Sequence, residues 1–128
     1  MSNIERTRAY LRSFETRDGA NLSFYADEVV QRELPNRLVP EGATRALADL
    51  RAAAERGKRS VAEERYEVVN LVELGDEVAV EALWSARLNV AFGKLAAGDV
   101  MRAHLAMFIT WRDGKIVSQR NYDCFEPF

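Results

Sequence analysis

Two segments with alternating apolar and polar residues lie near the C-terminus, residues 100–111 and Lys115–Phe125, with only Arg112-Asp113-Gly114 between them. A period of two is typical of β-strands, and glycine readily takes the positive φ angle that a tight turn needs. The pattern therefore predicts an antiparallel hairpin. Three successive polar residues on one face of a hydrophobic sheet need water, partners or a ligand, so we look for a functional site there. This face of the second strand carries Val117, Gln119, Asn121, Asp123 and Phe125.

Two more alternating segments precede the hairpin, Val61–Leu74 and residues 77–91, joined by Gly75-Asp76. A looser connection over residues 93–99 leads into the hairpin. Long sequential strands with hairpin connections are expected to form an antiparallel meander.

Helical patterns fill the first half of the chain. Asn3 can cap a helix that runs to about Thr16. A short second helix is expected over roughly residues 21–25, followed by a brief strand at 29–34.

A third helix is expected after a proline-containing loop, with Thr44 as its cap and Gly57 at its end. Helices must then cover one face of the sheet. The predicted class is α+β: three N-terminal helices packed on an antiparallel sheet, in a single domain over residues 1–128.

Composition excludes several classes of function. The formal net charge is −2, and no basic cluster with interleaved aromatic residues suggests nucleic acid as a partner. Cys124 is the only cysteine and His104 the only histidine, which excludes an internal disulfide and metal sites built from several thiolates or imidazoles. No segment has the apolar core of a signal peptide or the length of a membrane span. We therefore expect a cytoplasmic protein without a metal or redox cofactor.

The order of helix, short helix, strand, helix and long meander resembles the nuclear-transport-factor-two-like superfamily, also called the SnoaL-like or ketosteroid-isomerase-like fold. Local similarities are FYADEVV at residues 24–30, RDGKIV at residues 112–117 and the polar strand that follows. The resemblance covers essentially the whole chain. It implies a cone-shaped domain whose curved sheet and helices enclose a deep apolar pocket, and a homodimer formed through the convex face of the sheet. The fold hosts enzymes, binding modules and transport factors alike.

The resemblance to ketosteroid isomerases implies roles for two residues. In those enzymes a tyrosine on the first helix and a protonated aspartate form an oxyanion hole, and another aspartate is the general base. Tyr10 matches the tyrosine, and Glu33 falls at the position of the base. Counting back from the turn puts Ala106 or Met107 at the position of the oxyanion-hole acid. Neither side chain donates a hydrogen bond, so a true steroid isomerase is not expected.

The SnoaL-like polyketide cyclases resemble the chain in a different way, because they carry an acid/base aspartate on the last strand. By count from Gly114, Asn121 occupies that position, and Asp123 lies two residues further on the same face.

Each candidate acid or base has a functional and a structural interpretation. In a pocket, Asp123 would lose hydration, its pKa would rise, and it could exchange protons near neutral pH. The alternative is a carboxylate at the end of the strand that forms an ion pair with an arginine such as Arg120 or Arg87, or that is exposed at the mouth of the pocket. Glu33 is either a base or a solvated glutamate on an edge strand, close to Arg32 and Arg37.

Amide and aromatic side chains complete the candidate site. Gln119 and Asn121 are expected to contact a ligand, because amides both donate and accept hydrogen bonds. Tyr10 is either catalytic or a core residue with its hydroxyl at the rim. Three large apolar side chains are expected mainly in the core, and a place in the pocket wall is their second interpretation: Trp84, Trp111 and Met107.

The position of His104 depends on the length of the hairpin turn. A two-residue turn at Asp113-Gly114 sets His104 opposite Asp123, where a dyad would line the cavity. A three-residue loop sets His104 opposite Tyr122 instead. The cleaner apolar face that begins at Ala103 favours the three-residue loop and places His104 on the convex face.

The leading hypothesis is an isomerase- or cyclase-type enzyme acting on an apolar, polyketide- or steroid-like ligand that bears a carbonyl. Glu33 or Asp123 would move a proton at an activated carbon. Tyr10, with Asn121 or Gln119, would hold the developing enolate oxygen. The alternatives are a non-catalytic domain that binds a hydrophobic ligand, and a dimerisation module whose tryptophan and methionine side chains fill the cavity.

Overall fold

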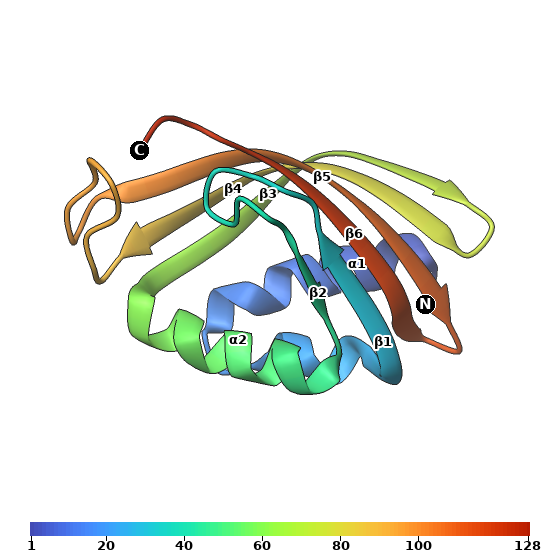
Figure 1. Cartoon of the computed structure of the whole chain (residues 1–128). Helices are drawn as coiled ribbons and strands as arrows, with labels where there is room; N and C mark the ends of the chain where they lie inside the picture. The colour runs from blue at the N-terminus through green and yellow to red at the C-terminus, as the bar shows by residue number, and fades with distance from the viewer.

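The computed structural model describes residues 1–128, and in it one curved sheet wraps over two α-helices (Figure 1). The elements in chain order are α1 (Asn3–Ser13), the 3₁₀ helices η1 (Phe14–Thr16) and η2 (Ala20–Phe24), β1 (Tyr25–Glu33), β2 (Ala43–Arg45), α2 (Leu47–Ser60), β3 (Val61–Leu74), β4 (Glu77–Leu88), β5 (Val100–Arg112) and β6 (Lys115–Phe125). The α+β class is therefore confirmed.

The sheet has six strands in the order β2-β1-β6-β5-β4-β3. Strands β3 to β6 form the expected antiparallel meander. Strand β1 joins β6 in parallel, so the sheet is mixed, and Gln31 and Glu33 lie beside Gln119 and Asn121. This pairing brings a second strand with polar residues next to the polar face of β6.

Local hydrogen bonds explain where the two α-helices begin. In both helices the capping residue differs from the predicted one. The Ser2 hydroxyl accepts a hydrogen bond from the Glu5 amide, and the Glu5 carboxylate accepts one from the Ser2 amide, each at 3.1 Å. Ser2, not Asn3, therefore caps α1. Helix α2 begins after Ala46, whose amide donates to the Asp49 carboxylate, while Thr44 lies in β2.

The prediction of three helices is confirmed for two α-helices only. The segment expected as a second helix is the 3₁₀ helix η2, and Tyr25 already begins β1. Gly19, with a φ of 81°, precedes η2, and only five residues separate it from the strand. So short a segment supports a tight 3₁₀ turn and no α-helical ladder. Two smaller boundaries also differ, because α2 continues past Gly57 to Ser60 and β4 ends at Leu88.

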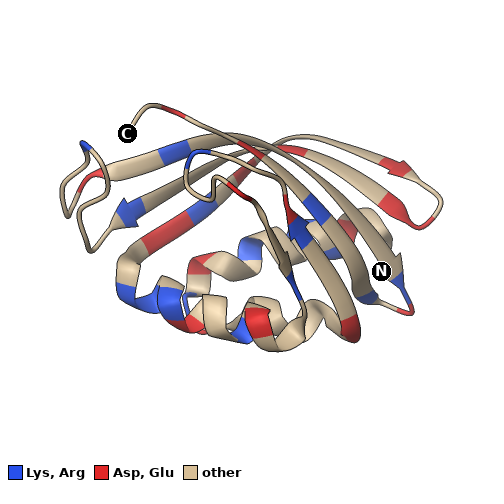
Figure 2. Ribbon diagram, in the orientation of Figure 1, with Lys and Arg blue, Asp and Glu red and all other residues tan.

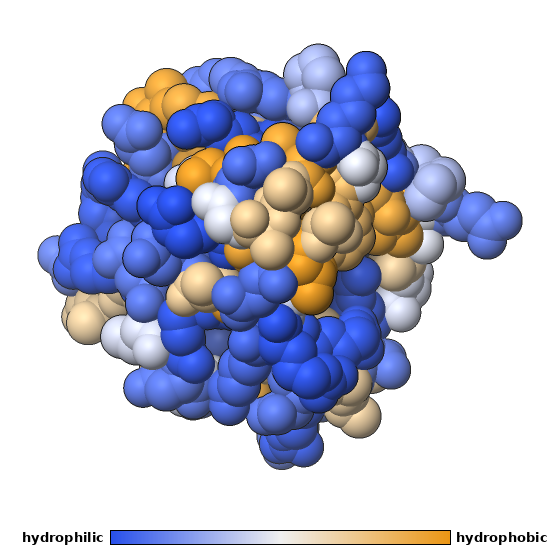
Figure 3. Space-filling model, turned by 90° about the vertical axis from the view of Figure 1, so that its left-hand side faces the viewer, coloured by the Kyte–Doolittle hydropathy of each residue, from blue (hydrophilic) through white to orange (hydrophobic).

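The main core lies between the concave face of the sheet and the helices. Its buried members come from α1, α2 and every strand from β1 to β6 except β2 and β3. A smaller cluster of Leu88, Met101 and Phe128 lies where β4 ends and β5 begins. Seen from that end, apolar side chains form a patch surrounded by polar ones (Figure 3).

Charged residues of both signs are spread over the helices, strands and loops in the view of Figure 2. No helix in the structure combines the length and the apolar character needed to cross a bilayer.

Candidate functional site

A cavity of about 310 Å³ lies between the concave face of the sheet and the helices. Tyr10 and Phe14 on the α1 side and Ala53 of α2 line it on the helical side, while Leu105 and Met107 of β5 line it on the sheet side and form part of its floor. Two polar walls face it, one from β1, β2 and β6 and one from β3. No group of three or more histidine, cysteine, aspartate or glutamate side chains is arranged to hold a metal ion.

The hairpin turn decides which β6 side chains reach the cavity. Asp113 and Gly114 both have positive φ angles, 52° and 75°, and Arg112 lies opposite Lys115. The turn thus has two residues, and the prediction of a three-residue loop is wrong because Asp113 accepts a positive φ. A bulge then leaves Val117 without a partner. Val117 does not line the cavity, whereas Gln119, Asn121 and Asp123 do.

The bulge also settles the position of His104. His104 lies opposite Cys124, and not opposite Asp123 or Tyr122. Both residues are exposed, and His104 Nε2 lies 3.0 Å from Glu126 Oε2. A His–Asp dyad is therefore absent from the cavity, and His104 lies on the outer face, as the sequence pattern favoured.

A chain of hydrogen bonds fixes the side chains at the α1 end of the cavity. The Tyr10 hydroxyl donates to Gln119 Oε1 at 2.9 Å and lies 2.6 Å from the Tyr25 hydroxyl. Because Tyr10 has a single proton, Tyr25 must be the donor of that pair. Gln119 Nε2 donates to Asn121 Oδ1 at 2.9 Å and contacts Met107 Sδ at 3.6 Å.

These hydrogen bonds determine which donors and acceptors remain available to a ligand. Burial, and next the neighbouring Tyr25, raise the pKa of Tyr10 well above its ordinary value, so its hydroxyl stays protonated. That proton, like the Gln119 amide, is already used inside the protein. The Asn121 Oδ1 atom accepts from Gln119, which leaves the Asn121 NH₂ group as the donor toward the cavity. Tyr10 and Gln119 therefore position Asn121.

Asp123 is the acid/base candidate with the fewest partners. Its Oδ1 atom is buried without a hydrogen bond. Burial, with a smaller contribution from the negative charge of Glu33, raises the pKa of Asp123 to about 6, and Arg45 opposes this rise. The ion pairs considered from the sequence are not made, because Arg120 pairs with Glu77 and Arg87 with Glu63.

Glu33 lines the same wall but has partners for both of its oxygens. Its Oε1 atom lies 2.8 Å from Arg45 Nη1, and its Oε2 atom accepts a hydrogen bond from Asn36 Nδ2 at 2.7 Å. The side chain is 12% exposed. Glu33 is thus not the solvated glutamate of the structural interpretation, and both of its oxygens already have partners within the protein.

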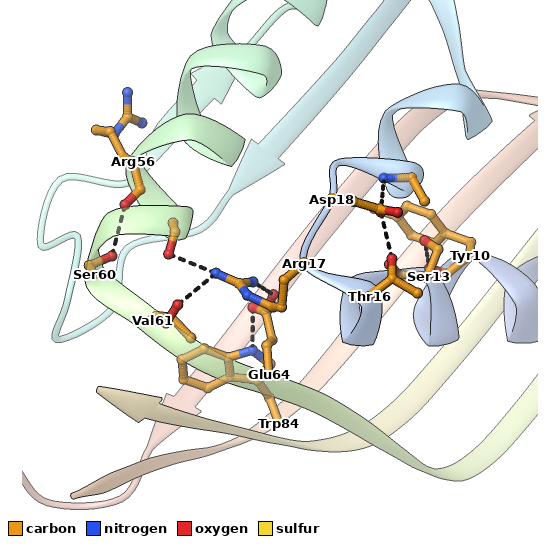
Figure 4. A network of polar contacts seen from close by, with 12 residues as sticks. Tyr10, Ser13, Thr16, Arg17, Asp18, Arg56, Ser60, Val61, Glu64 and Trp84 are labelled. Atoms are coloured by element: carbon orange, nitrogen blue, oxygen red, sulfur yellow. Dashed lines mark hydrogen bonds and ion pairs between the residues drawn. The ribbon is translucent and has the colours of Figure 1, made fainter. Parts of the chain in front are cut away.

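The second polar wall consists of Glu64 and Tyr66 on β3, which sequence reasoning missed. Glu64 Oε1 lies 2.7 Å from Arg17 Nη1, and Glu64 Oε2 accepts a hydrogen bond from Trp84 Nε1 at 2.9 Å (Figure 4). Alternation along β3 places Glu64 and Tyr66 on one face. However, β3 also carries Glu63 and Glu67, and nothing in the pattern shows which of these glutamates meets the cavity.

Arg17 holds this wall against α2. It has a φ of 58° at the end of η1, and its Nη2 atom donates to the carbonyl oxygens of Gly57 and Val61 at 2.7 and 3.1 Å (Figure 4). The guanidinium therefore joins the last turn of α2 to the beginning of β3 and fixes the Glu64 carboxylate.

The two apolar residues expected at the site have different positions. Met107 lines the cavity. Trp111 does not, because it is buried near Phe24 and its Nε1 atom donates to Thr7 Oγ1 at 3.0 Å. Trp84, in contrast, does line the cavity.

Comparison with known families agrees with this architecture. The family model described as a SnoaL-like domain matches residues 7–119. The chain belongs to the SnoaL-like family. This confirms the resemblance to the nuclear-transport-factor-two-like superfamily that the order of elements indicated. A comparison with curated protein sequences gives no match.

Solved structures share the SnoaL-like fold over nearly the whole chain. AclR of Streptomyces galilaeus, a proposed hydroxylase, has a TM-score of 0.77 at 19% identity and covers 98% of this chain and 83% of its own. IdmH of Streptomyces antibioticus, a proposed polyketide cyclase, has a TM-score of 0.78 at 17% identity, with 96% and 92% coverage. A Catenulispora acidiphila protein with a ketosteroid isomerase-like fold, in complex with trimethylamine, has a TM-score of 0.76 at 16% identity, with 96% and 88% coverage. Identities this low establish the fold alone.

Proposed function

We propose that this SnoaL-like protein is an isomerase- or cyclase-type enzyme that moves a proton at the carbon next to a carbonyl group of a small, largely apolar ligand. The observation that carries the proposal is the Asp123 carboxylate, which faces the cavity with one buried, unpartnered oxygen and a pKa raised to about 6. A general base works best when its pKa lies near the working pH. The structural neighbour IdmH is described as a proposed polyketide cyclase, and a cyclase reaction belongs to this class.

Asp123 and Asn121 have separate roles in the proposed step. The ionised Asp123 takes a proton from the α-carbon, and the electron pair of the broken C–H bond moves into the enolate. The Asn121 NH₂ group donates a hydrogen bond to the enolate oxygen, where the interaction strengthens as charge develops. Asp123 then returns the proton, either to another carbon in an isomerisation or to the oxygen formed when the enolate carbon attacks a second carbonyl.

The cavity also indicates what the ligand looks like. Its volume of about 310 Å³ is at the lower end of the range of about 300–1,000 Å³ typical of ligand pockets, which suits a compact ligand. Its floor is apolar. Its walls carry the carboxyl groups of Glu33, Glu64 and Asp123 and the guanidinium of Arg45, so an anionic ligand would be repelled.

The pH dependence of proton exchange tests this proposal. We use 1-tetralone, a bicyclic aryl ketone, and follow the loss of its C2 proton signal in deuterated buffer by NMR. Because the ionised form of Asp123 is the base, the enzyme-dependent rate should rise about tenfold per pH unit below about pH 6 and level off above it. The buffer rate at each pH is subtracted.

Two outcomes would contradict the proposal. An enzyme-dependent rate that does not change between about pH 4.5 and about pH 7.5 would exclude a base with this pKa. Binding of the ketone without any exchange above the buffer rate would favour a non-catalytic ligand-binding domain.

A further inference from the structure

The β3 wall of the cavity lies across the floor from the proposed reacting groups. Tyr66 lies opposite Trp84 on β4, Trp84 opposite Ala103 on β5, and Ala103 opposite Phe125 on β6. Three strand spacings, about 14 Å along the sheet, therefore separate Tyr66 from β6. Because the sheet is curved, side chains of both strands line one cavity (Figure 1). A ligand on the apolar floor would meet the two walls with opposite ends.

Tyr66 is the polar group on this wall that is free to bind. Its hydroxyl forms no hydrogen bond with another group of the protein, although the side chain lines the cavity. Burial, followed by the negative charges of Glu64 and Asp123, raises the pKa of Tyr66 well above its ordinary value. The hydroxyl is thus held neutral, with one proton to donate and lone pairs to accept.

Glu64 adds a fixed acceptor two residues away on the same face. Arg17 and Trp84 each occupy one of its oxygens and hold the carboxylate in place. A carboxylate has about four lone-pair positions, so Glu64 can accept one more hydrogen bond from a ligand. The side chain is 14% exposed, and it lines the cavity.

We propose that Tyr66 and Glu64 form a subsite for a hydroxyl group at the end of the ligand remote from the reacting carbonyl. This inference rests on the proposed function for the placement of that carbonyl. The ligand hydroxyl accepts a hydrogen bond from Tyr66 and donates one to Glu64. An anionic oxygen is unsuited to this wall, because it would face the Glu64 carboxylate. The inferred substrate is therefore a compact cyclic ketone that carries a hydroxyl group.

Two matched ketones test the subsite. We measure dissociation constants of 1-tetralone and 6-hydroxy-1-tetralone, in which the hydroxyl lies opposite the carbonyl, by titration calorimetry. Wild-type protein should bind the hydroxyketone about tenfold more tightly. Tyr66→Phe should lose about threefold to tenfold of that preference and leave the affinity for 1-tetralone unchanged. Tyr122→Phe, which changes an exposed tyrosine on the opposite face, is the matched control and should alter neither value.

A third ligand tests the Glu64 contact without any substitution. In 6-methoxy-1-tetralone the oxygen can accept a hydrogen bond but cannot donate one. It should bind wild-type protein more weakly than the hydroxyketone. This comparison remains decisive if Tyr66→Phe fails to fold.

The outcomes separate this inference from the proposed function. The subsite is refuted if wild-type protein has no preference between 1-tetralone and 6-hydroxy-1-tetralone, including no measurable binding of either. It is also refuted if Tyr66→Phe weakens the binding of both ketones by the same factor, as a purely structural role of Tyr66 would require. Exchange that depends on Asp123 without a hydroxyl preference would leave the proposed function standing. A hydroxyl preference without exchange would support the subsite in a binding protein.

Discussion

Replacing Asp123 with asparagine is expected to slow the enzyme-dependent exchange of 1-tetralone protons by a factor of about 10² to 10⁴. Asparagine has nearly the same shape as aspartate but cannot take up a proton from carbon at accessible pH. Affinity for 1-tetralone should change little, because the floor and the Asn121 amide are untouched. The rate is measured by NMR in deuterated buffer at about pH 7, and affinity by calorimetry on the same samples.

Two variants make this result specific to Asp123. Asp113→Asn is the matched control, because Asp113 is exposed in the hairpin turn and asparagine accepts the positive φ there. It should exchange at the wild-type rate. Glu33→Gln should have a smaller effect than Asp123→Asn, since the Glu33 carboxylate is bound by Arg45 and Asn36. Loss of exchange in Glu33→Gln, with activity retained in Asp123→Asn, would move the role of base to Glu33.

The same substitution is expected to stabilise the fold at neutral pH. The pKa of Asp123 is raised from 3.8 to about 6 in the folded protein, so the folded state binds more protons than the unfolded chain between these values. Stability must then fall as pH rises through this window. The difference between the two pKa values corresponds to a destabilisation of the folded state by at most about 3 kcal/mol above pH 6.

Asp123→Asn removes the buried charge, so its free energy of unfolding should exceed that of wild type by about 2–3 kcal/mol at about pH 7. The gain should shrink toward zero below about pH 3, well under the unfolded-state pKa of 3.8, where Asp123 is protonated in both states. Urea denaturation followed by tryptophan fluorescence measures it at both pH values. Asp113→Asn should show no gain of this kind. Equal or lower stability of Asp123→Asn at about pH 7 would show that burial does not strain the Asp123 carboxylate.

Much of the fold could be predicted from the sequence because its main determinants are local. Alternation defined the four long strands, and the order of elements indicated the superfamily. The hairpin register was not predictable in the same way. It depends on Asp113 taking a positive φ and on a bulge that leaves Val117 unpaired. The parallel pairing of β1 with β6 is likewise a long-range contact that no local pattern encodes.

The chemistry of the site was less predictable than its position. The polar face of β6 was identified, but which groups stay free depends on hydrogen bonds between distant elements. The Tyr10 hydroxyl donates to Gln119, the Gln119 amide donates to Asn121, and Glu33 is bound by Arg45. Tyr66 was missed because the curvature of the sheet, which no single strand specifies, brings β3 to the cavity.

The central claim is that the Asp123 carboxyl is a buried, proton-exchanging group of the cavity, and a carboxyl ¹³C NMR titration of the folded protein tests it most directly. Asp123→Asn identifies the signal by its absence. We expect the Asp123 signal to titrate with a pKa of about 6. Titration near its ordinary value of 3.8 would contradict the account, because a carboxylate that ionises so easily is neither desolvated nor suited to take a proton from carbon at neutral pH.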